Sequence, residues 1–200
     1  MTRQSFAIVP ACGASRRMGT NKLLLPWQDT TILETVLKAW HASSVDYVVL
    51  VTPADRQEVI ELAESSGARV AVVTEAPPDM KGTVLAGLRW IEQNLELGPG
   101  DVWLVAPADM PDLDPRTIDT VLAASEANPG KVVVPISGGQ HGHPALFPWS
   151  LIPAVENLGP EQGLRDLPDW SESVSVEVNE GGLGSDIDDP EEYLKRRQGF

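Results

Sequence analysis

Residues 5–22 read SFAIVPACGASRRMGTNK, an apolar run that leads directly into a loop of small and basic residues. The run over 5–11 is almost entirely apolar, which is typical of a strand buried on both faces of a sheet. Pro10 marks the strand end, because proline has no amide to donate to the sheet ladder. Small residues in the loop let the backbone approach a ligand, and consecutive amides can then hold phosphate oxygens.

Three basic residues follow in this loop, Arg16, Arg17 and Lys22, in a chain with 15 basic and 29 acidic residues. A lysine acts as a point charge and an arginine can bind two oxygens at once, so together they can neutralise a triphosphate. The loop is not a P-loop, because Lys22 stands too far from Gly19, and it lacks the dinucleotide G-x-G-x-x-G spacing. A glycine turn with surface bases is the alternative interpretation.

Strand and helix patterns alternate outward from this stretch. We expect further strands at 46–52, 69–74, 101–106, 131–136, 144–147 and 173–178. We expect helices at 31–41, 54–66, 82–95, 114–127, 151–158, 163–167 and 190–197. This order predicts a single domain over 1–200 with a doubly wound, three-layer α/β fold, in which helices cover both faces of a mostly parallel sheet. The quick succession of strands around 138–147 predicts an antiparallel addition.

Composition narrows the classes of function. The formal net charge of −14 argues against binding to nucleic acid or to anionic membranes. The single cysteine, Cys12, excludes an internal disulfide and a cysteine-rich zinc site. The chain has no apolar run of the roughly 20 residues that span a bilayer, and its first residues do not read as a secretory signal. We therefore expect a cytoplasmic protein.

Acidic residues follow a later strand and precede the last helix. In such sheets ligands bind at the carboxyl ends of strands, so Asp109, just after 101–106, is a candidate ligand for Mg²⁺. A turn-forming aspartate before a proline is the alternative. The segment 184–192 reads GSDIDDPEE and also has the pattern of a helix start, with Asp189 as cap and Pro190 as first residue.

The loop resembles the signature of the nucleotidyltransferases that complete the molybdenum cofactor, L-A-A-G-x-S-x-R-M-G-x-x-K. Residues 23–27, LLLPW, continue that resemblance, as do 101–111 (family G-D-M-P) and 186–192 (family D-I-D-T-P-E). The departures from the family pattern are Pro10, Cys12, Ala108 and Asp189. The resemblance implies that Asp109 and Asp188 hold Mg²⁺, and Asp186 is the alternative to Asp188.

The same resemblance implies roles for the first loop. The triphosphate would be bound by the loop residues Ala11, Cys12, Gly13, Ala14, Ser15, Arg16 and Gly19. Lys22 and Arg17 would act on its phosphates during catalysis. The implied fold is that of the nucleotide-diphospho-sugar transferases, which is close to the one predicted from periodicity.

Three further segments resemble the family in part. Thr83 lies in 80–88, which is similar to the family's helix start near the base and ribose, although a plain helix cap is the alternative. His143 lies in 138–147, which resembles the G-x-x-G-H-P-x-L-F segment of the cytidylyl branch. His143 and Arg165 are candidates for the acceptor phosphate, against a structural histidine and a surface arginine.

The resemblance therefore implies Mg²⁺-dependent transfer of CMP from CTP to the phosphate of a molybdopterin acceptor, with release of pyrophosphate. Because that phosphate is already ionised, neither a protein nucleophile nor a general base is required. Guanylyl transfer and transfer to another phosphorylated acceptor remain alternatives. A chain of another class, a non-catalytic chaperone that delivers the cofactor to a molybdoenzyme, would bind pterin without releasing pyrophosphate.

Overall fold

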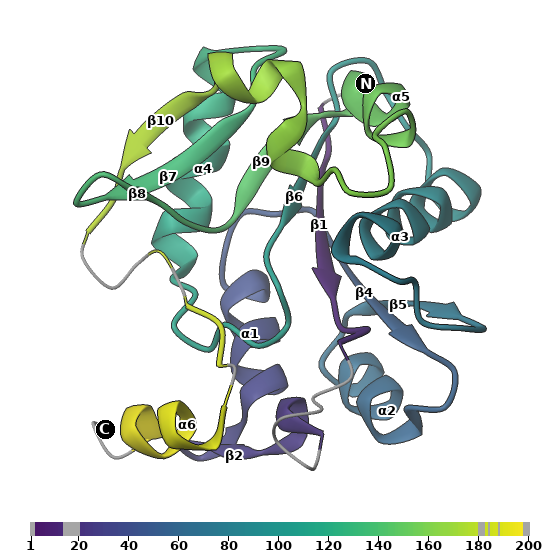
Figure 1. Cartoon of the computed structure of the whole chain (residues 1–200), viewed down its shortest axis with the longest axis vertical. Coiled ribbons are helices and arrows are strands. Elements are labelled where there is room, and N and C mark those ends of the chain that lie inside the picture. The colour runs from purple at the N-terminus through teal and green to yellow at the C-terminus, as the bar shows by residue number, and fades with distance from the viewer. Residues whose placement is uncertain (1–2, 14–20, 180–182, 184, 188, 198–200) are drawn as a thin grey trace.

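A sheet of eight strands forms the centre of the protein in the computed structural model, which describes residues 3–13, 21–179, 183, 185–187 and 189–197 (Figure 1). The strand order is β10-β7-β9-β6-β1-β4-β5, and β8 pairs with β7. The strands are β1 (Ser5–Pro10), β4 (Tyr47–Pro53), β5 (Arg69–Val73), β6 (Val102–Val105), β7 (Val133–Ser137), β8 (Gln140–His141), β9 (Ala145–Pro148) and β10 (Val174–Glu177). A separate two-stranded hairpin joins β2 (Pro26–Trp27) to β3 (Thr30–Thr31).

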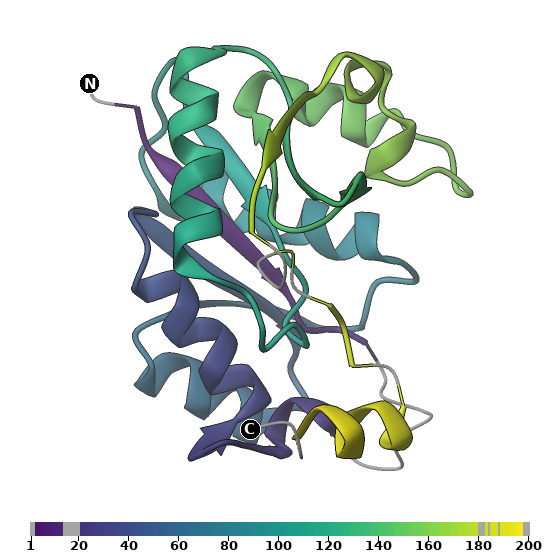
Figure 2. The same cartoon turned by 90° about the vertical axis from the view of Figure 1, so that its left-hand side faces the viewer.

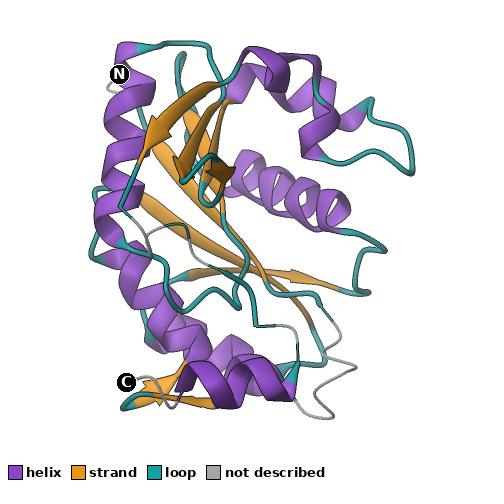
Figure 3. Cartoon of the chain, turned by 60° about the vertical axis from the view of Figure 1, so that its left-hand side comes forward, coloured by secondary structure: helices purple, strands orange, loops and turns teal. Residues whose placement is uncertain are grey.

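Helices cover both faces of the sheet, as predicted (Figures 2 and 3). They are α1 (Ile32–His41), α2 (Gln57–Ser65), α3 (Met80–Asn94), α4 (Pro115–Ala127), α5 (Ile152–Glu156) and α6 (Pro190–Arg197). Because side chains alternate along a strand, Ala7 and Val9 of β1 pack with α1, α2 and α4, whereas Phe6 and Ile8 pack with α3 and α5. The predicted three-layer α/β architecture is confirmed.

The directions of the strands also follow the prediction. β1 pairs in parallel with β4 and β6, and β4 pairs in parallel with β5. The antiparallel addition is β9, which runs against both β6 and β7. Because β1 lies between β4 and β6, the segments that follow these three strands emerge side by side at one edge of the sheet. Among the described helices, none is long and apolar enough to cross a membrane.

Some helix boundaries differ from expectation. The helix expected to begin at residue 82 begins at Met80, because the Asp79 carboxylate accepts a hydrogen bond from the Gly82 amide at 2.6 Å. This correction makes Asp79, and not Thr83, the cap of α3. The helix expected over 54–66 is shorter, at Gln57–Ser65, and the one expected over 163–167 is a 3₁₀ turn, η3 (Leu164–Asp166).

Close packing holds the middle of α3 against β1 and β4. A Cβ atom at Gly87 would lie 2.9 Å from Cγ2 of Val51 and 3.0 Å from Cγ2 of Ile8, so only a glycine lets the helix lie this close to β1 and β4.

The last helix, α6, packs beside the β2–β3 hairpin (Figure 1). Tyr193 of α6 donates a hydrogen bond to the Pro26 carbonyl at 2.7 Å.

Candidate active site

An ion pair joins the first loop to the loop after β6. Asn21 caps a short 3₁₀ turn, η1 (Lys22–Leu24), because its side chain accepts a hydrogen bond from the Leu23 amide at 3.2 Å. This cap fixes the start of the turn that carries Lys22. The Lys22 ammonium contacts Oδ2 of Asp109 and donates to the Ile187 carbonyl at 2.8 Å. The two paired side chains are 12% and 15% exposed. The structure therefore brings together two predicted site residues that are far apart in the sequence.

The other oxygen of Asp109 gives a test of metal binding. Oδ1 is buried and accepts no hydrogen bond from the described residues. A buried carboxylate oxygen without a partner costs free energy, and a hard divalent cation is a ligand that would satisfy it. Among the described residues, no group of three or more acidic, histidine or cysteine side chains is arranged so that it could hold a metal ion by itself. Asp109 thus fits a Mg²⁺ site of the kind that one or two carboxylates and substrate phosphates complete.

The first loop begins between its two neighbouring strands. The Ala11 amide donates to the Val51 carbonyl at 2.9 Å, and the Ala108 amide donates to the Pro10 carbonyl at 3.1 Å. The side chain of Arg56, in the segment after β4, donates to three successive loop carbonyls, those of Ala11, Cys12 and Gly13. Sequence reasoning missed Arg56, although its place just after the strand next to β1 was an available signal.

A cavity of about 470 Å³ opens beside this loop. Its lining comprises Pro10, Cys12, Gly13, Ala76, Pro77, Pro78, Asp79, Met80, Thr83, Pro107 and Asp109. Thr83 is buried, and its hydroxyl donates to the Asp79 carbonyl at 3.1 Å. Burial raises the pKa of the Cys12 thiol, so this cavity wall is neutral there. The cavity is large enough for a small-molecule ligand.

A second cavity, of about 340 Å³, adjoins the first and shares Met80 and Pro107 with it. The rest of its lining is Lys81, Val105, His143, Ala145, Phe147, Gly163, Leu164, Arg165, Asp166 and Trp170. Lys81 donates to the Gly159 carbonyl at 2.5 Å and so ties the start of α3 to the loop that carries Arg165. Both predicted acceptor residues therefore line one cavity, together with Lys81 and Trp170, which sequence reasoning did not assign to it.

His143 is held mainly by backbone groups. Its Nδ1 bonds to the Val105 carbonyl at 3.2 Å, and its amide donates to the Leu183 carbonyl at 3.1 Å. Burial lowers the pKa of the imidazole, which favours a neutral ring at physiological pH. A ligand in this cavity would therefore meet a hydrogen-bonding group at His143 and a positive charge at Arg165, whose side chain is exposed.

The chain near its C-terminus lies against the ion pair. The Ile187 amide donates to the Asp109 carbonyl at 3.2 Å. Arg196 of α6 pairs with Asp112 at 2.5 Å and donates to the carbonyls of Ser185 and Asp186, each at 3.1 Å. As the sequence predicted, Asp189 caps the last helix, because its carboxylate accepts from the Glu192 amide at 2.9 Å. Arg196 therefore ties residues 185–187 to the loop that carries the metal candidate.

We expect Arg196→Met to release this segment, because it removes the ion pairs with Asp112 and Glu192 and two charged hydrogen bonds from a side chain that is 17% exposed. Hydrogen exchange at the Ile187 amide should accelerate by about tenfold, or roughly 1.4 kcal/mol. Arg197→Met is the matched control, because Arg197 lies over the Tyr193 ring on the same helix. Equal exchange rates at Ile187 in the two variants would contradict this account.

Several predicted residues have no described position. Of the residues predicted to bind the nucleotide or act in catalysis, five lie outside the described residues: Ala14, Ser15, Arg16, Arg17 and Gly19. The predicted metal ligand Asp188 also lies outside them. Other predicted residues, which the structure does describe, line the two cavities. The first is lined by Cys12, Gly13, Thr83 and Asp109, and the second by His143 and Arg165. Ala11 is buried at the start of the loop.

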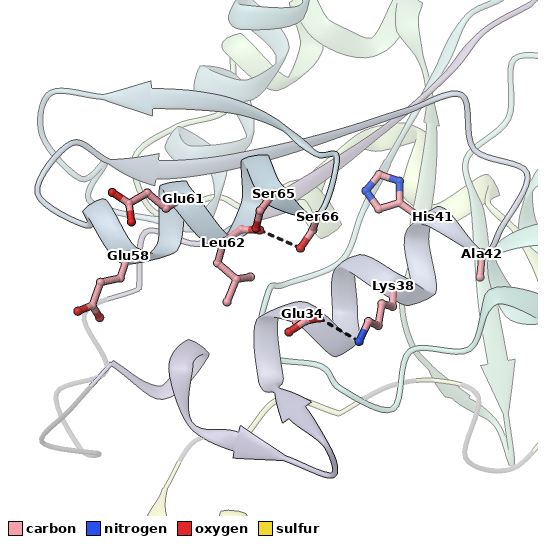
Figure 4. Close-up of a pocket in the computed structure, with 9 residues that line it drawn as sticks. All are labelled: Glu34, Lys38, His41, Ala42, Glu58, Glu61, Leu62, Ser65 and Ser66. Atoms are coloured by element: carbon pink, nitrogen blue, oxygen red, sulfur yellow. Dashed lines mark hydrogen bonds and ion pairs between the residues drawn. The ribbon is translucent and has the colours of Figure 1, made fainter.

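A larger hollow of about 930 Å³ lies between α1 and α2 (Figure 4). It is lined by Glu34, Lys38, His41, Ala42, Glu58, Glu61, Leu62, Ser65 and Ser66. Glu34 and Lys38 pair across one helical turn at 2.9 Å. Among the described residues, none from the loops after β1, β5 and β6 lines this hollow, so its size does not make it the active site.

Comparison with known proteins agrees with this arrangement. A family model described as the MobA-like NTP transferase domain matches residues 7–174, which include the first loop, Asp109 and both cavities' predicted residues. The chain belongs to this family. The predicted family is confirmed.

Individual relatives are more distant. A probable molybdenum cofactor guanylyltransferase of Bacillus cereus (strain ZK / E33L) is 31% identical over 133 residues, which are 66% of this chain and 62% of that protein. The molybdenum cofactor cytidylyltransferase of Escherichia coli (strain K12) is 23% identical over 193 residues, 96% of this chain and 95% of that protein. The chain thus aligns with less than two thirds of the guanylyltransferase.

The fold of the MobA-like family member matches solved structures. The crystal structure of the Mycobacterium tuberculosis Rv0371c homologue from Mycobacterium sp. strain JC1 superposes with a TM-score of 0.79 at 21% identity, covering 98% of this chain and 96% of that chain. The doubly wound sheet predicted from the sequence is therefore a fold that proteins of very different sequence share.

Proposed function

We propose that this protein is a nucleotidyltransferase that binds a nucleoside triphosphate in the first cavity and a phosphorylated pterin in the second. The observation that carries the proposal is the contact between Lys22 and Asp109 at the wall of the first cavity. It brings the cation at the end of the first loop to the carboxylate that we propose as a metal ligand. The shared residues Met80 and Pro107 then set the two substrates next to each other.

In this reaction an oxygen of the acceptor phosphate bonds to the α-phosphorus, the bond from that phosphorus to the bridging oxygen breaks, and pyrophosphate leaves. Lys22 would neutralise charge on the phosphate oxygens, and the loop amides would hold the leaving phosphates. Asp109, with Asp188 as the predicted second ligand, would hold Mg²⁺. When bound, Mg²⁺ would neutralise phosphoryl charge and orient the triphosphate. The contact with Lys22 would also orient the Asp109 carboxylate.

We favour CTP as the nucleotide. The support is the G-H-P-x-L-F segment, which places His143 in the second cavity, and the near full-length alignment with a cytidylyltransferase. GTP is the second candidate, since the guanylyltransferase relative has the higher identity over a shorter alignment. The second cavity suits a ring-bearing anion, because Phe147 and Trp170 supply aromatic walls and Arg165 and Lys81 supply positive charge.

Pyrophosphate release with Mg²⁺, molybdopterin and each of CTP, GTP, ATP and UTP in turn tests this proposal. We expect release with CTP at a rate at least about tenfold above the other three, which is roughly 1.4 kcal/mol of discrimination. Release with GTP instead would support the same mechanism and would make the protein a guanylyltransferase. Folded protein that binds the pterin and releases no pyrophosphate would favour the chaperone. The single domain over 1–200 and the cytoplasmic location stay predictions.

A further inference from the structure

We propose that Arg56 is a positioning residue that presets the first loop for the triphosphate. This inference rests on the proposed function, because it assigns Arg56 to the nucleotide site. Arg56 lies at the start of α2, in the segment that follows β4. Its role is to hold loop carbonyls on one side of the backbone so that the amides face the other side.

The contacts of its guanidinium carry the argument. Nη1 donates to the Ala11 carbonyl at 2.6 Å, and Nη2 donates to the carbonyls of Cys12 and Gly13 at 3.2 and 2.7 Å. Three successive carbonyl oxygens of the loop therefore point toward one side chain. A planar guanidinium offers its donors in a fixed fork, whereas the ammonium of lysine is a point charge. Arginine is thus suited to hold three acceptors at once.

Because of peptide geometry, these contacts also fix the direction of the loop amides. The carbonyl and the amide of one trans peptide unit point in opposite directions. Because Arg56 holds the carbonyls of Ala11 and Cys12, it directs the amides of Cys12 and Gly13 away from itself. Cys12 and Gly13 line the first cavity, where the phosphates are proposed to bind. Successive amides on one side of a loop form a concave site for anions.

The side chain of Arg56 is not used to build its own helix. Arg56 occupies the N-cap position of α2, yet no side-chain capping bond forms there. Its backbone is placed by the hydrogen bond from its amide to the Pro53 carbonyl, at 3.2 Å. Because Pro10 pairs with Val51 in the sheet, the segment after β4 starts level with the first loop. The sheet therefore brings the guanidinium within reach of the loop.

A further consequence concerns charge. The guanidinium satisfies carbonyl oxygens that would otherwise repel a phosphate, and it places a positive charge behind the loop. Both effects act on the bound triphosphate more than on the acceptor in the second cavity. We therefore expect Arg56 variants to change the KM for the nucleotide more than kcat, and to leave the KM for the pterin nearly unchanged.

The test compares Arg56→Gln and Arg56→Lys with the unmodified protein. We expect Arg56→Gln to raise the KM for the nucleotide about 10- to 100-fold, with kcat changed less than about threefold. Arg56→Lys should recover part of the loss, because lysine keeps the charge but not the fork. Arg116→Gln is the control, since its guanidinium pairs with Asp114 at the surface. It should behave as the unmodified protein.

A second measurement needs no substrate. In amide NMR spectra of the free protein, the resonances of Cys12 and Gly13 should move in Arg56→Gln and stay unchanged in Arg116→Gln. Unmoved resonances would overturn the positioning role, even if Arg56→Gln were inactive because of lower stability. If the Arg56→Gln variant is active and its KM for the nucleotide is unchanged, the positioning role is also overturned, and the proposed function stays intact. If the unmodified protein binds no nucleoside triphosphate, as measured by calorimetry, both proposals fall.

Discussion

Asp109→Asn is expected to abolish Mg²⁺-dependent turnover, with kcat/KM falling on the order of 1,000-fold or more. The amide cannot bind a hard cation as a carboxylate does, and it cannot pair with Lys22. The buried oxygen Oδ1, which accepts no hydrogen bond from the described residues, is the atom we expect to face the metal. The measurement is pyrophosphate release over a range of Mg²⁺ concentrations.

The control for this variant is Asp55→Asn, which removes one negative charge from an exposed position after β4, at the same edge of the sheet. It should retain activity, because Asp55 lies outside both cavities. Asp109→Asn with turnover and Mg²⁺ dependence like those of Asp55→Asn would remove Asp109 from the metal site. Titration of Mn²⁺ by paramagnetic relaxation gives a readout that does not depend on turnover: binding should weaken in Asp109→Asn alone.

Lys22→Met is expected to lower kcat/KM for the nucleotide by about 100- to 1,000-fold. Methionine keeps much of the length of the side chain but removes the charge that would meet the phosphates. Lys38→Met is the control, since Lys38 is 63% exposed and pairs with Glu34 on α1. Steady-state kinetics at saturating acceptor separate the two variants, and equal kinetic constants would refute the phosphate role of Lys22.

Loss of folding is a rival explanation for both variants, because removing one partner of a partly buried ion pair takes a charged contact from the other. Each single change should lower the free energy of unfolding by about 1–3 kcal/mol. The double variant Lys22→Met/Asp109→Asn removes both charges of the pair and should regain part of that stability. It should nonetheless stay inactive, since both groups act on the substrate. Recovery of activity together with stability would mean that the pair is structural.

Much of the fold followed from the sequence because burial and periodicity are local signals. The apolar residues over 5–11 predicted a central strand, and β1 is indeed paired on both sides. Asp114 and Pro115 correctly predicted the start of α4, because capping depends on neighbouring residues. The start of α3 was predicted two residues late, because the sequence did not identify Asp79 as the cap. In the structure its carboxylate accepts a hydrogen bond from the Gly82 amide.

The candidate site was predictable where a motif covers it. Lys22 and Asp109 were assigned separately from two segments, and the structure shows them in contact. Arg56 and Arg196 were missed because each acts on backbone carbonyls of a distant segment, and no sequence motif marks such a contact. For Arg56, the position just after β4 was the one available signal. The sequence assigned Lys81 no place in the site. In the structure it ties α3 to the loop of the second cavity.

The most direct measurement follows the α-phosphate itself. The protein is incubated with Mg²⁺, molybdopterin and the triphosphate that gives the fastest pyrophosphate release, labelled at the α-phosphate. We predict that the label moves into a product that contains the pterin, and that the released pyrophosphate carries none. Label that remains in the triphosphate, or appears as free nucleoside monophosphate while the pterin stays unlabelled, would contradict nucleotidyl transfer by this protein.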